Sequence, residues 1–224
     1  MRPTLAAFAL VALAGVTSAQ AADAKDSPTL NAKPPEGAVV LFDGKDLSAW
    51  RGGDGKSPAP WTVEDGIFTV KPKSGVIRTD KTFGSFVLHV EFNIPYMPDA
   101  KGQARGNSGV YLQGKYELQV LDSYGLTPKN NECGAIYQQI VPSVNACLPP
   151  LRWQTYDITF NAAKDGKKAR LSVVQNGQTI IDDKEIVITP GGIDGLKDED
   201  DGPIMLQDHG NLVSFRNIWL VPAK

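Results

Sequence analysis

Short apolar and aromatic runs, separated by turn residues, recur along the chain from Val39 to Val221. Gly, Asp, Asn and Pro stand between the runs, and no long segment has apolar residues at the helical period of 3.6. This succession predicts an all-β sandwich of two antiparallel sheets with little helix. The expected strands are residues 39–42, 61–63, 67–70, 76–79, 85–94, 108–113, 116–122, 134–137, 153–161, 169–175, 178–187, 204–207 and 213–221.

One pair of runs predicts a β-hairpin that turns at Gly114 and Lys115. Strict alternation gives it an apolar face and a polar face, and the polar face carries Asn107, Tyr111, Glu117 and Gln119, with Asp122 at the end of the second strand. A polar face exposed to solvent is the norm in antiparallel sheets, so a plain outer surface is one interpretation. Amides and a phenol beside a single carboxylate favour the other interpretation, a site that holds sugar hydroxyls.

The N-terminus has the pattern of a secretory signal peptide over residues 1–21. Arg2 provides the positive charge, residues 5–16 form an apolar core, and the small residues Ala19 and Ala21 flank the cleavage site. No cysteine follows that site, so a lipid anchor is not expected. The sequence therefore predicts a periplasmic or secreted protein with a flexible lead-in over residues 22–37 and a single domain over residues 38–224.

Charge and apolar length exclude two classes of partner. The formal net charge is −2 without a basic cluster, so the chain has no electrostatic footprint for nucleic acid. After the signal peptide, no apolar run approaches the ~20 residues of a transmembrane helix, so no membrane partner is expected. Export permits a disulfide between Cys133 and Cys147, but their spacing does not decide whether it forms. The acidic stretch of residues 198–201 fits a solvated loop better than a calcium loop.

The two histidines differ in context. His209 follows the strand expected near residue 206 and precedes a glycine, with Gln207 on the same side of the chain. Strand ends are common places for working residues, although a surface or structural histidine fits the same pattern. His89 lies within a strand and is interpreted as structural. For Arg216, pairing with a carboxylate and binding of substrate are equally compatible with the pattern.

Several catalytic motifs are absent from the sequence. It contains no G-x-S-x-G elbow, P-loop, H-E-x-x-H or dinucleotide fingerprint. Gln119 stands where a second acid would accompany Glu117 in a two-carboxylate glycosidase. Ordinary two-carboxylate glycoside hydrolysis is therefore not expected.

A set of motifs in fixed order resembles the 3-keto-disaccharide hydrolase domain family over residues 38–222. The motifs are Leu41-Phe-Asp-Gly-Lys-Asp-Leu-Ser-Ala-Trp50, Trp61 with Glu64-Asp-Gly66, Asn107-Ser-Gly-Val-Tyr111, Tyr116-Glu-Leu-Gln-Val-Leu-Asp122, Cys133-Gly-Ala-Ile-Tyr137, Trp153-Gln-Thr-Tyr-Asp157, His209-Gly210 and Phe215-Arg-Asn217. The resemblance implies a concanavalin A-like jelly roll whose concave face binds carbohydrate, with Tyr137 among the substrate contacts. It also implies activity on glycosides that carry a ketone at C3.

That substrate explains how one carboxylate suffices. A C3 ketone acidifies the C2 proton, so one base can start β-elimination of the C1 substituent, and water can add afterwards to give net hydrolysis. Glu117 and His209 are the expected base and proton donor, in either order, while Asn107, Gln119 and Arg216 bind hydroxyls or polarise the ketone. No cofactor is predicted; a divalent ion at the enolate is compatible with the chemistry but no ligand spacing indicates one.

Two other functions fit the same pattern. A non-catalytic carbohydrate-binding module would share the sandwich and the ligand but leave the glycoside intact. A purely structural envelope protein would bind no sugar.

Overall fold

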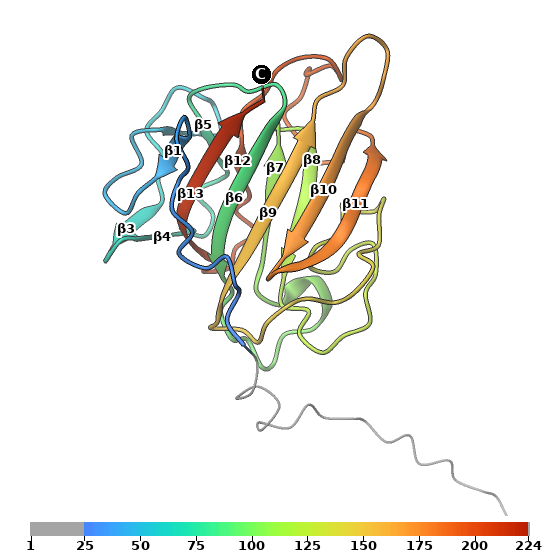
Figure 1. Cartoon of the computed structure of the whole chain (residues 1–224). Coiled ribbons are helices and arrows are strands. Elements are labelled where there is room, and N and C mark those ends of the chain that lie inside the picture. Colours follow the sequence, from blue (N-terminus) through green and yellow to red (C-terminus); the bar gives the residue numbers. More distant parts are fainter. Residues whose placement is uncertain (1–24, 224) are drawn as a thin grey trace, which may run out of the picture.

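The chain folds as a sandwich of two antiparallel sheets, as expected from its alternating pattern (Figure 1). The structure, a computed structural model, describes residues 25–223, so the expected signal peptide lies outside the described residues. Within this range the helical content is one short 3-10 turn, η1 (Gly102–Ala104), and no helix is long and apolar enough to cross a membrane. The all-β fold class is confirmed.

The two sheets differ in size. The larger sheet has the order β11 (Gln178–Ile186), β10 (Ala169–Gln175), β9 (Trp153–Asn161), β6 (Phe86–Asn93), β13 (Ser214–Pro222), β4 (Ile67–Thr69) and β3 (Thr62–Glu64), with β1 (Val39–Phe42) also paired to β13. The smaller sheet has the order β2 (Trp50–Gly52), β5 (Ile77–Thr79), β12 (Met205–Leu206), β7 (Asn107–Leu112) and β8 (Tyr116–Leu121).

The inner faces of the sheets form the core. Alternate residues of β6, such as Phe86 and Leu88, and of the β7–β8 hairpin, such as Val110 and Leu118, are fully buried between the sheets. Each buried side chain of this size contributes roughly 1.5–3 kcal/mol. A one-residue slip of the hairpin would turn these apolar side chains outward, so the core fixes the register that aims the polar residues away from it.

The strand expected at residues 134–137 exists only in part. The segment runs along β8, where the Gly134 amide donates to Gln119 O at 3.0 Å and the Tyr137 amide donates to Glu117 O at 3.1 Å. Positive φ angles of 82° at Gly134 and 60° at Gln138 bend the chain at both ends of the segment. The ladder therefore stops after an isolated bridge, but it still carries Tyr137 to the edge of the hairpin.

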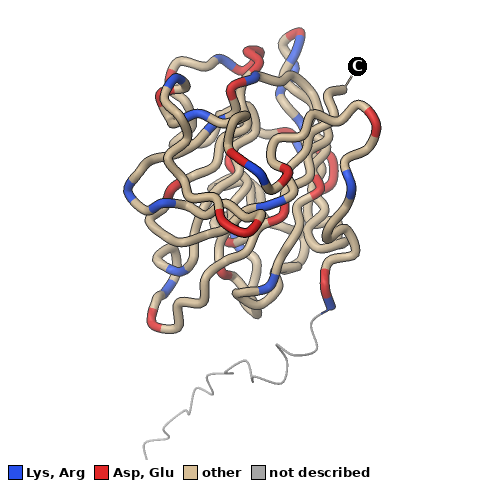
Figure 2. The backbone as a smooth tube through the Cα atoms, turned by 90° about the vertical axis from the view of Figure 1, so that its left-hand side faces the viewer, with Lys and Arg blue, Asp and Glu red and all other residues tan. Residues whose placement is uncertain are grey.

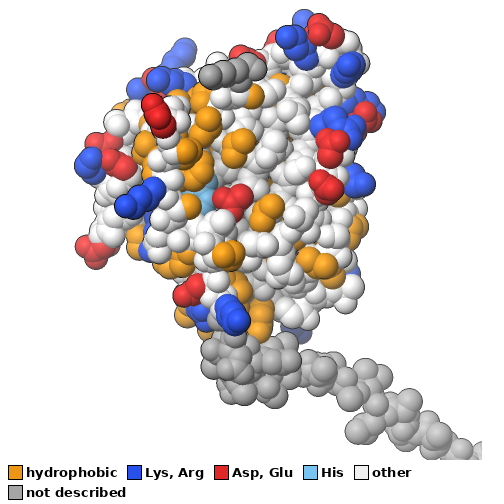
Figure 3. Space-filling view, in the orientation of Figure 1, with side chains coloured by type: hydrophobic (Ala, Val, Ile, Leu, Met, Phe, Trp, Pro, Cys, Tyr) orange, Lys and Arg blue, Asp and Glu red, His pale blue; other side chains and the backbone are white. Residues whose placement is uncertain are grey.

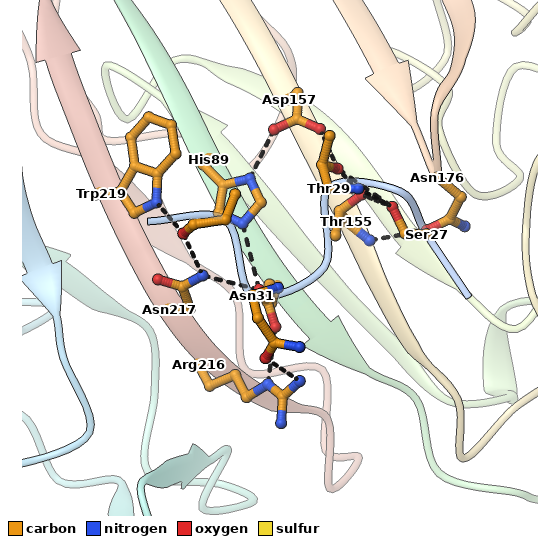
Figure 4. Close-up of polar contacts among 12 residues, drawn as sticks. Ser27, Thr29, Asn31, His89, Thr155, Asp157, Asn176, Arg216, Asn217 and Trp219 are labelled. Carbon is orange, nitrogen blue, oxygen red and sulfur yellow. Dashed lines mark hydrogen bonds and ion pairs between the residues drawn. The ribbon is translucent and has the colours of Figure 1, made fainter. Parts of the chain in front are cut away.

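The expectation of a flexible lead-in is wrong for residues 25–37. This segment crosses the outer face of the larger sheet (Figures 1 and 4). The Thr29 hydroxyl donates to Asp157 at 2.6 Å, the Asn31 amide donates to Glu91 at 2.5 Å, and Ser27 Oγ lies 2.6 Å from Thr155 Oγ1. Its composition gave no sign of order because polar contacts to another element, rather than a periodic apolar face, hold it in place.

Beneath this segment lies a buried ionic network. His89 Nδ1 lies 2.6 Å from Asp157, and its ring stacks on Trp219 with centroids 5.0 Å apart. Burial raises the pKa of Glu91, but hydrogen bonds from His89, Asn217 and Arg216 outweigh it and lower that pKa to about 2. For His89, burial lowers the pKa, and the bonds to Asp157 and Glu91 more than reverse this, so the pKa is raised.

In the described part of the chain, positively and negatively charged residues are interspersed. Lys and Arg alternate with Asp and Glu around the loops (Figure 2). On the face of the larger sheet, charged side chains gather mainly near the edges, while apolar and uncharged atoms cover much of the middle (Figure 3).

Candidate active site

A pocket of about 210 Å³ opens on the outer face of the smaller sheet, above the β7–β8 hairpin. Its volume is below the ~300 Å³ at which sites for drug-sized ligands begin, which suits a ligand about as large as one sugar unit. The lining residues are Gln103, Asn107, Tyr111, Glu117, Gln119, Tyr137, Pro190, Gly191, Gln207 and His209. Polar groups therefore dominate the wall, as the alternation of the hairpin indicated.

The hairpin register places the central groups beside one another. Tyr111 lies directly opposite Glu117, and Gly109 lies opposite Gln119. Side chains of opposed residues on one face lie within contact distance. A Cβ on Gly109 would come within 2.6 Å of Glu117 Oε1, so this glycine leaves the space that the carboxyl occupies.

The environment of Glu117 suits acid–base chemistry. Burial raises its pKa to about 7, and hydrogen bonds with Tyr111 and Gln207 offset only part of that shift. A carboxyl with this pKa is half ionised near neutral pH, where it can accept a proton and return it. Burial and the adjacent Glu117 also raise the pKa of Tyr111, whose phenol therefore stays protonated and can donate.

The segment after β11 packs over the hairpin and completes the pocket. The Glu117 amide donates to Thr189 Oγ1 at 2.9 Å, and the Thr189 hydroxyl donates to Lys115 O at 2.9 Å. These bonds place Pro190 and Gly191 at the pocket wall. Gly191 has φ +85°, and a Cβ there would lie 2.9 Å from the Tyr111 hydroxyl, so the close approach requires glycine.

The acidic stretch near residue 200 surrounds a lysine. Lys115 Nζ donates to the backbone carbonyls of Lys197, Asp198 and Asp200 at 3.0, 2.7 and 2.6 Å. Charge-assisted bonds of this kind are about twice as strong as neutral ones, so they anchor the loop. No group of three or more His, Cys, Asp and Glu side chains in the described part of the chain is arranged to hold a metal ion.

His209 lies exposed at the rim of the pocket, on the loop after β12. The preceding Asp208 holds this loop, because its carboxylate accepts from the amides of Gly210 at 2.8 Å and Gly75 at 3.0 Å. The position allows His209 to reach a ligand in the pocket.

Two of the residues expected to bind substrate lie elsewhere. Arg216 is on β13 of the other sheet, where it donates to Glu91 at 2.8 Å and stacks on Trp153 at 4.2 Å, so the structural alternative is correct. Asp122 follows the end of β8 and is not in the pocket lining. Its amide donates to Gly106 O at 2.9 Å, the next position of the hairpin register, so alternation places Asp122 on the opposite face from Glu117 and Gln119. The pocket brings together the other seven expected residues.

The pocket also contains residues that sequence reasoning missed. Gln103 reaches it from η1, and its short loop has no periodic pattern from which this could be read. Pro190 and Gly191 stood out as turn residues, but nothing in the sequence linked their turn to the hairpin. The two cysteines, Cys133 and Cys147, are buried free thiols behind the site, so the structure contains no bridge between them.

A β-sandwich with amides, phenols and a carboxyl in an open pocket is typical of a carbohydrate-active protein. The chain belongs to the family of 3-keto-alpha-glucoside-1,2-lyase-like domains, whose sequence model matches residues 37–221. The family expected from the motifs is thereby confirmed. No curated protein matches the chain.

Solved structures support the same class. A protein of Parabacteroides distasonis, named as a candidate glycosyl hydrolase, is 40% identical with a TM-score of 0.76 over 84% of this chain and 85% of that chain. A second such protein from the same organism is 22% identical, with a TM-score of 0.63 over 84% and 95% of the two chains. The potassium-bound carbohydrate recognition domain of Emp46p is 11% identical, with a TM-score of 0.50 over 86% and 100%. The last two show the fold alone.

Proposed function

We propose that the protein cleaves the glycosidic bond of 3-keto-glycosides, with Glu117 as the base that removes the C2 proton. The observation that carries this proposal is a single carboxyl, 4% exposed, on the pocket wall with a pKa raised by burial to about 7. A lone base of this strength matches proton removal next to a ketone better than it matches two-carboxylate hydrolysis.

The proposed reaction is an elimination. Glu117 takes the proton from C2, and the C2–H electron pair forms a C2–C3 enolate with the ketone oxygen. The enolate then reforms the ketone, makes the C1–C2 double bond and breaks the bond from C1 to the leaving oxygen, which takes up a proton. Addition of water across the new double bond gives the free 3-keto sugar, so elimination followed by hydration equals hydrolysis.

The remaining pocket residues have matching tasks in this proposal. The Tyr111 phenol donates to Glu117 and steadies its charged form. His209, at the rim, supplies the proton for the departing oxygen or a hydrogen bond to the enolate. The proposal makes the buried carboxyl the base, because its pKa is near 7, and the exposed histidine at the rim the proton donor.

The experiment is a product analysis. Incubation of the protein with a 3-keto-disaccharide in deuterated water should release an unsaturated 3-keto sugar, or free 3-keto sugar with deuterium at C2. Release of the 3-keto sugar without deuterium at C2 would contradict the elimination. An intact disaccharide would favour the alternative, a non-catalytic carbohydrate-binding module, which the lectin-like fold also accommodates.

We also propose that the protein acts in the periplasm or outside the cell. The charged start, apolar core and small-residue cleavage site in residues 1–21 support this. N-terminal sequencing of the exported protein should begin at Ala22, and a chain that retains Met1 would contradict it.

A further inference from the structure

Three amide oxygens of the pocket have no hydrogen-bond partner within the described residues although they are buried. They are Asn107 Oδ1, Gln119 Oε1 and Gln207 Oε1. Asn107 and Gln119 are each 1% exposed. A buried acceptor without a partner destabilises the folded state, so a site that keeps three of them in one pocket is incomplete without its ligand.

The orientation of two of these amides is set by Gln103. Its own nitrogen donates to Asn131 O at 2.7 Å, which fixes where Gln103 Oε1 points. That oxygen accepts from Asn107 Nδ2 at 3.3 Å and from Gln119 Nε2 at 2.9 Å. Asn107 Nδ2 also donates to the Gln103 backbone carbonyl at 2.9 Å, and Gln119 Nε2 to Asn131 O at 3.4 Å. Because both amide nitrogens are engaged on the Gln103 side, both amide oxygens are directed away from it.

The third amide, that of Gln207, is held by Tyr111 and Glu117. Gln207 Nε2 donates to the Tyr111 hydroxyl at 3.3 Å, and the same side chain bonds to Glu117. With its nitrogen engaged, Gln207 also leaves its oxygen free. The pocket therefore combines three free acceptors with a carboxyl and contains no Lys or Arg among its lining residues.

We propose that Asn107, Gln119 and Gln207 form an acceptor wall that holds hydroxyl groups of an uncharged sugar and rejects sugars that carry a carboxylate or sulfate. Each oxygen needs a donor, and vicinal sugar hydroxyls supply several donors on one small ring. An anionic sugar would bring further acceptors and a second negative charge beside Glu117. The inference rests on the proposed function in that it takes the ligand to be a sugar.

The same wall orients the sugar. A C3 ketone is itself an acceptor, so it cannot face three amide oxygens and must face donors. Within the lining, His209 and the Tyr137 phenol are the donors available to the ketone, because the Tyr111 phenol already donates to Glu117. The hydroxyl groups away from C3 then meet the amides. A divalent cation is a poorer match, because neutral amides and one partly protonated carboxyl supply little charge.

The test measures binding without turnover. Dissociation constants are determined by NMR titration, in metal-free buffer, for methyl glucoside, its 2-deoxy, 4-deoxy and 6-deoxy analogues, and methyl glucuronide. We expect at least two deoxy analogues to bind roughly tenfold more weakly than methyl glucoside, and the glucuronide to bind at least tenfold more weakly.

Three variants test whether the acceptor wall causes these losses of affinity. In Asn107→Leu and Gln119→Met, the affinity for methyl glucoside should fall, and the penalty for one particular deoxy analogue should disappear in each variant. Gln103→Met removes the 2.9 Å bond to Gln119 Nε2 but keeps the backbone bond to Asn107 Nδ2, so it should weaken the Gln119 penalty more than the Asn107 penalty, whereas a general loss of structure would weaken both alike. Gln113→Met is the matched control: this buried glutamine also has a free oxygen, but it lies outside the pocket, where its nitrogen donates to Phe83 O at 2.8 Å.

The outcomes separate the two proposals. Hydroxyl-specific binding without cleavage of a 3-keto-disaccharide would support the wall and contradict the enzyme. Cleavage with equal affinity for all analogues, equal affinity for the glucuronide, or no sugar binding at all would overturn the wall. Binding that requires added calcium or manganese chloride would overturn it in favour of a cation site.

Discussion

At the scale of single residues, burial gives Glu117 its chemistry, and its removal is the most direct test of that role. In Glu117→Gln the side chain keeps its shape but cannot accept a proton. Turnover of a 3-keto-disaccharide should fall by at least about 100-fold, the usual contribution of a general base. Sugar binding should persist, since the acceptor wall is intact. Turnover within a few-fold of the parent would contradict the assignment.

Gly109 offers a second residue-scale prediction, because its missing side chain makes room for the Glu117 carboxyl, the proposed base. In Gly109→Ala the new methyl group would lie 2.6 Å from Glu117 Oε1, so the flexible carboxyl must shift. We expect a loss of turnover of about tenfold or more, since misplacement of a reacting group by about 1 Å costs up to about 100-fold. The free energy of unfolding should change little, because only the end of a side chain moves.

The matched control is Gly52→Ala in β2 of the same sheet. A Cβ at Gly52 would meet its nearest neighbours at 3.5 Å or more, an ordinary contact. Both variants are compared by steady-state kinetics and urea unfolding. Equal turnover in the two variants would show that the position of the carboxyl is not limiting.

At the scale of elements, alternation made much of the fold predictable. The bounds expected for β1, β9 and β10 agree with the structure. In β9 and β10 alternate residues are buried, and only one register can bury that face. The β2 strand was missed because Trp50, Arg51 and Gly52 are too few to show a period. The same alternation distinguished the polar face of the hairpin from its core face. It therefore predicted that Asn107, Tyr111, Glu117 and Gln119 lie side by side.

Contacts between elements that are distant in the chain could not be predicted from the sequence. The sequence around Arg216 is equally compatible with binding a sugar and with pairing to Glu91. Only the packing of β13 beside β6 shows that Arg216 pairs with Glu91. Gln103 acts through amide orientation, which no sequence pattern encodes. The lead-in is the clearest case, since its Ser, Pro and Lys content is typical of disorder, while its hydrogen-bond partners lie more than 50 residues away.

That lead-in gives an element-scale prediction. A variant that lacks residues 1–33 loses the hydrogen bonds from Thr29 to Asp157 and from Asn31 to Glu91, and leaves these carboxylates partly uncovered. Hydrogen bonds to charged groups contribute roughly 1.5–3 kcal/mol each, so the free energy of unfolding should fall by about 2–4 kcal/mol. Turnover under stable conditions should persist because the pocket lies on the other sheet. A variant that lacks only residues 1–25 is the control, and equal stability of the two would contradict this role.

At the scale of the whole molecule, buried titratable groups on both sheets make the stability of the fold depend on pH. The pKa of Glu91 is lowered to about 2, so its network stabilises the fold above the ordinary value of 4.5, and this contribution is lost as the pH falls toward 2. The pKa of His89 is raised above 6.5, so its contribution is present below 6.5 and is lost as the pH rises through the folded value. The outer network of the larger sheet therefore favours mildly acidic conditions.

Glu117, in the pocket of the smaller sheet, lowers the stability of the fold further as the pH rises. The pKa of Glu117 is raised from 4.5 to about 7, so the folded state is favoured with Glu117 protonated, and that preference is lost as the pH rises through 7. Catalysis needs the opposite, ionised form. The loss of stability begins above about pH 4.5, the unfolded value, and is complete above about 7, so the molecule should be most stable near pH 4.5–5, while its turnover should rise with pH through about 7.

Urea unfolding between pH 3 and pH 9, together with a pH–rate profile, tests this separation. Glu117→Gln should gain stability relative to the parent only as the pH rises, with almost no difference at pH 4 and a gain of about 1–3 kcal/mol at pH 9, because a shift of one pKa unit corresponds to about 1.4 kcal/mol. Comparison with the parent at each pH cancels the contributions of Glu91 and His89. A constant difference across the range, or a stability maximum above pH 7.5, would show that the buried carboxyl does not link the stability of the fold to its activity.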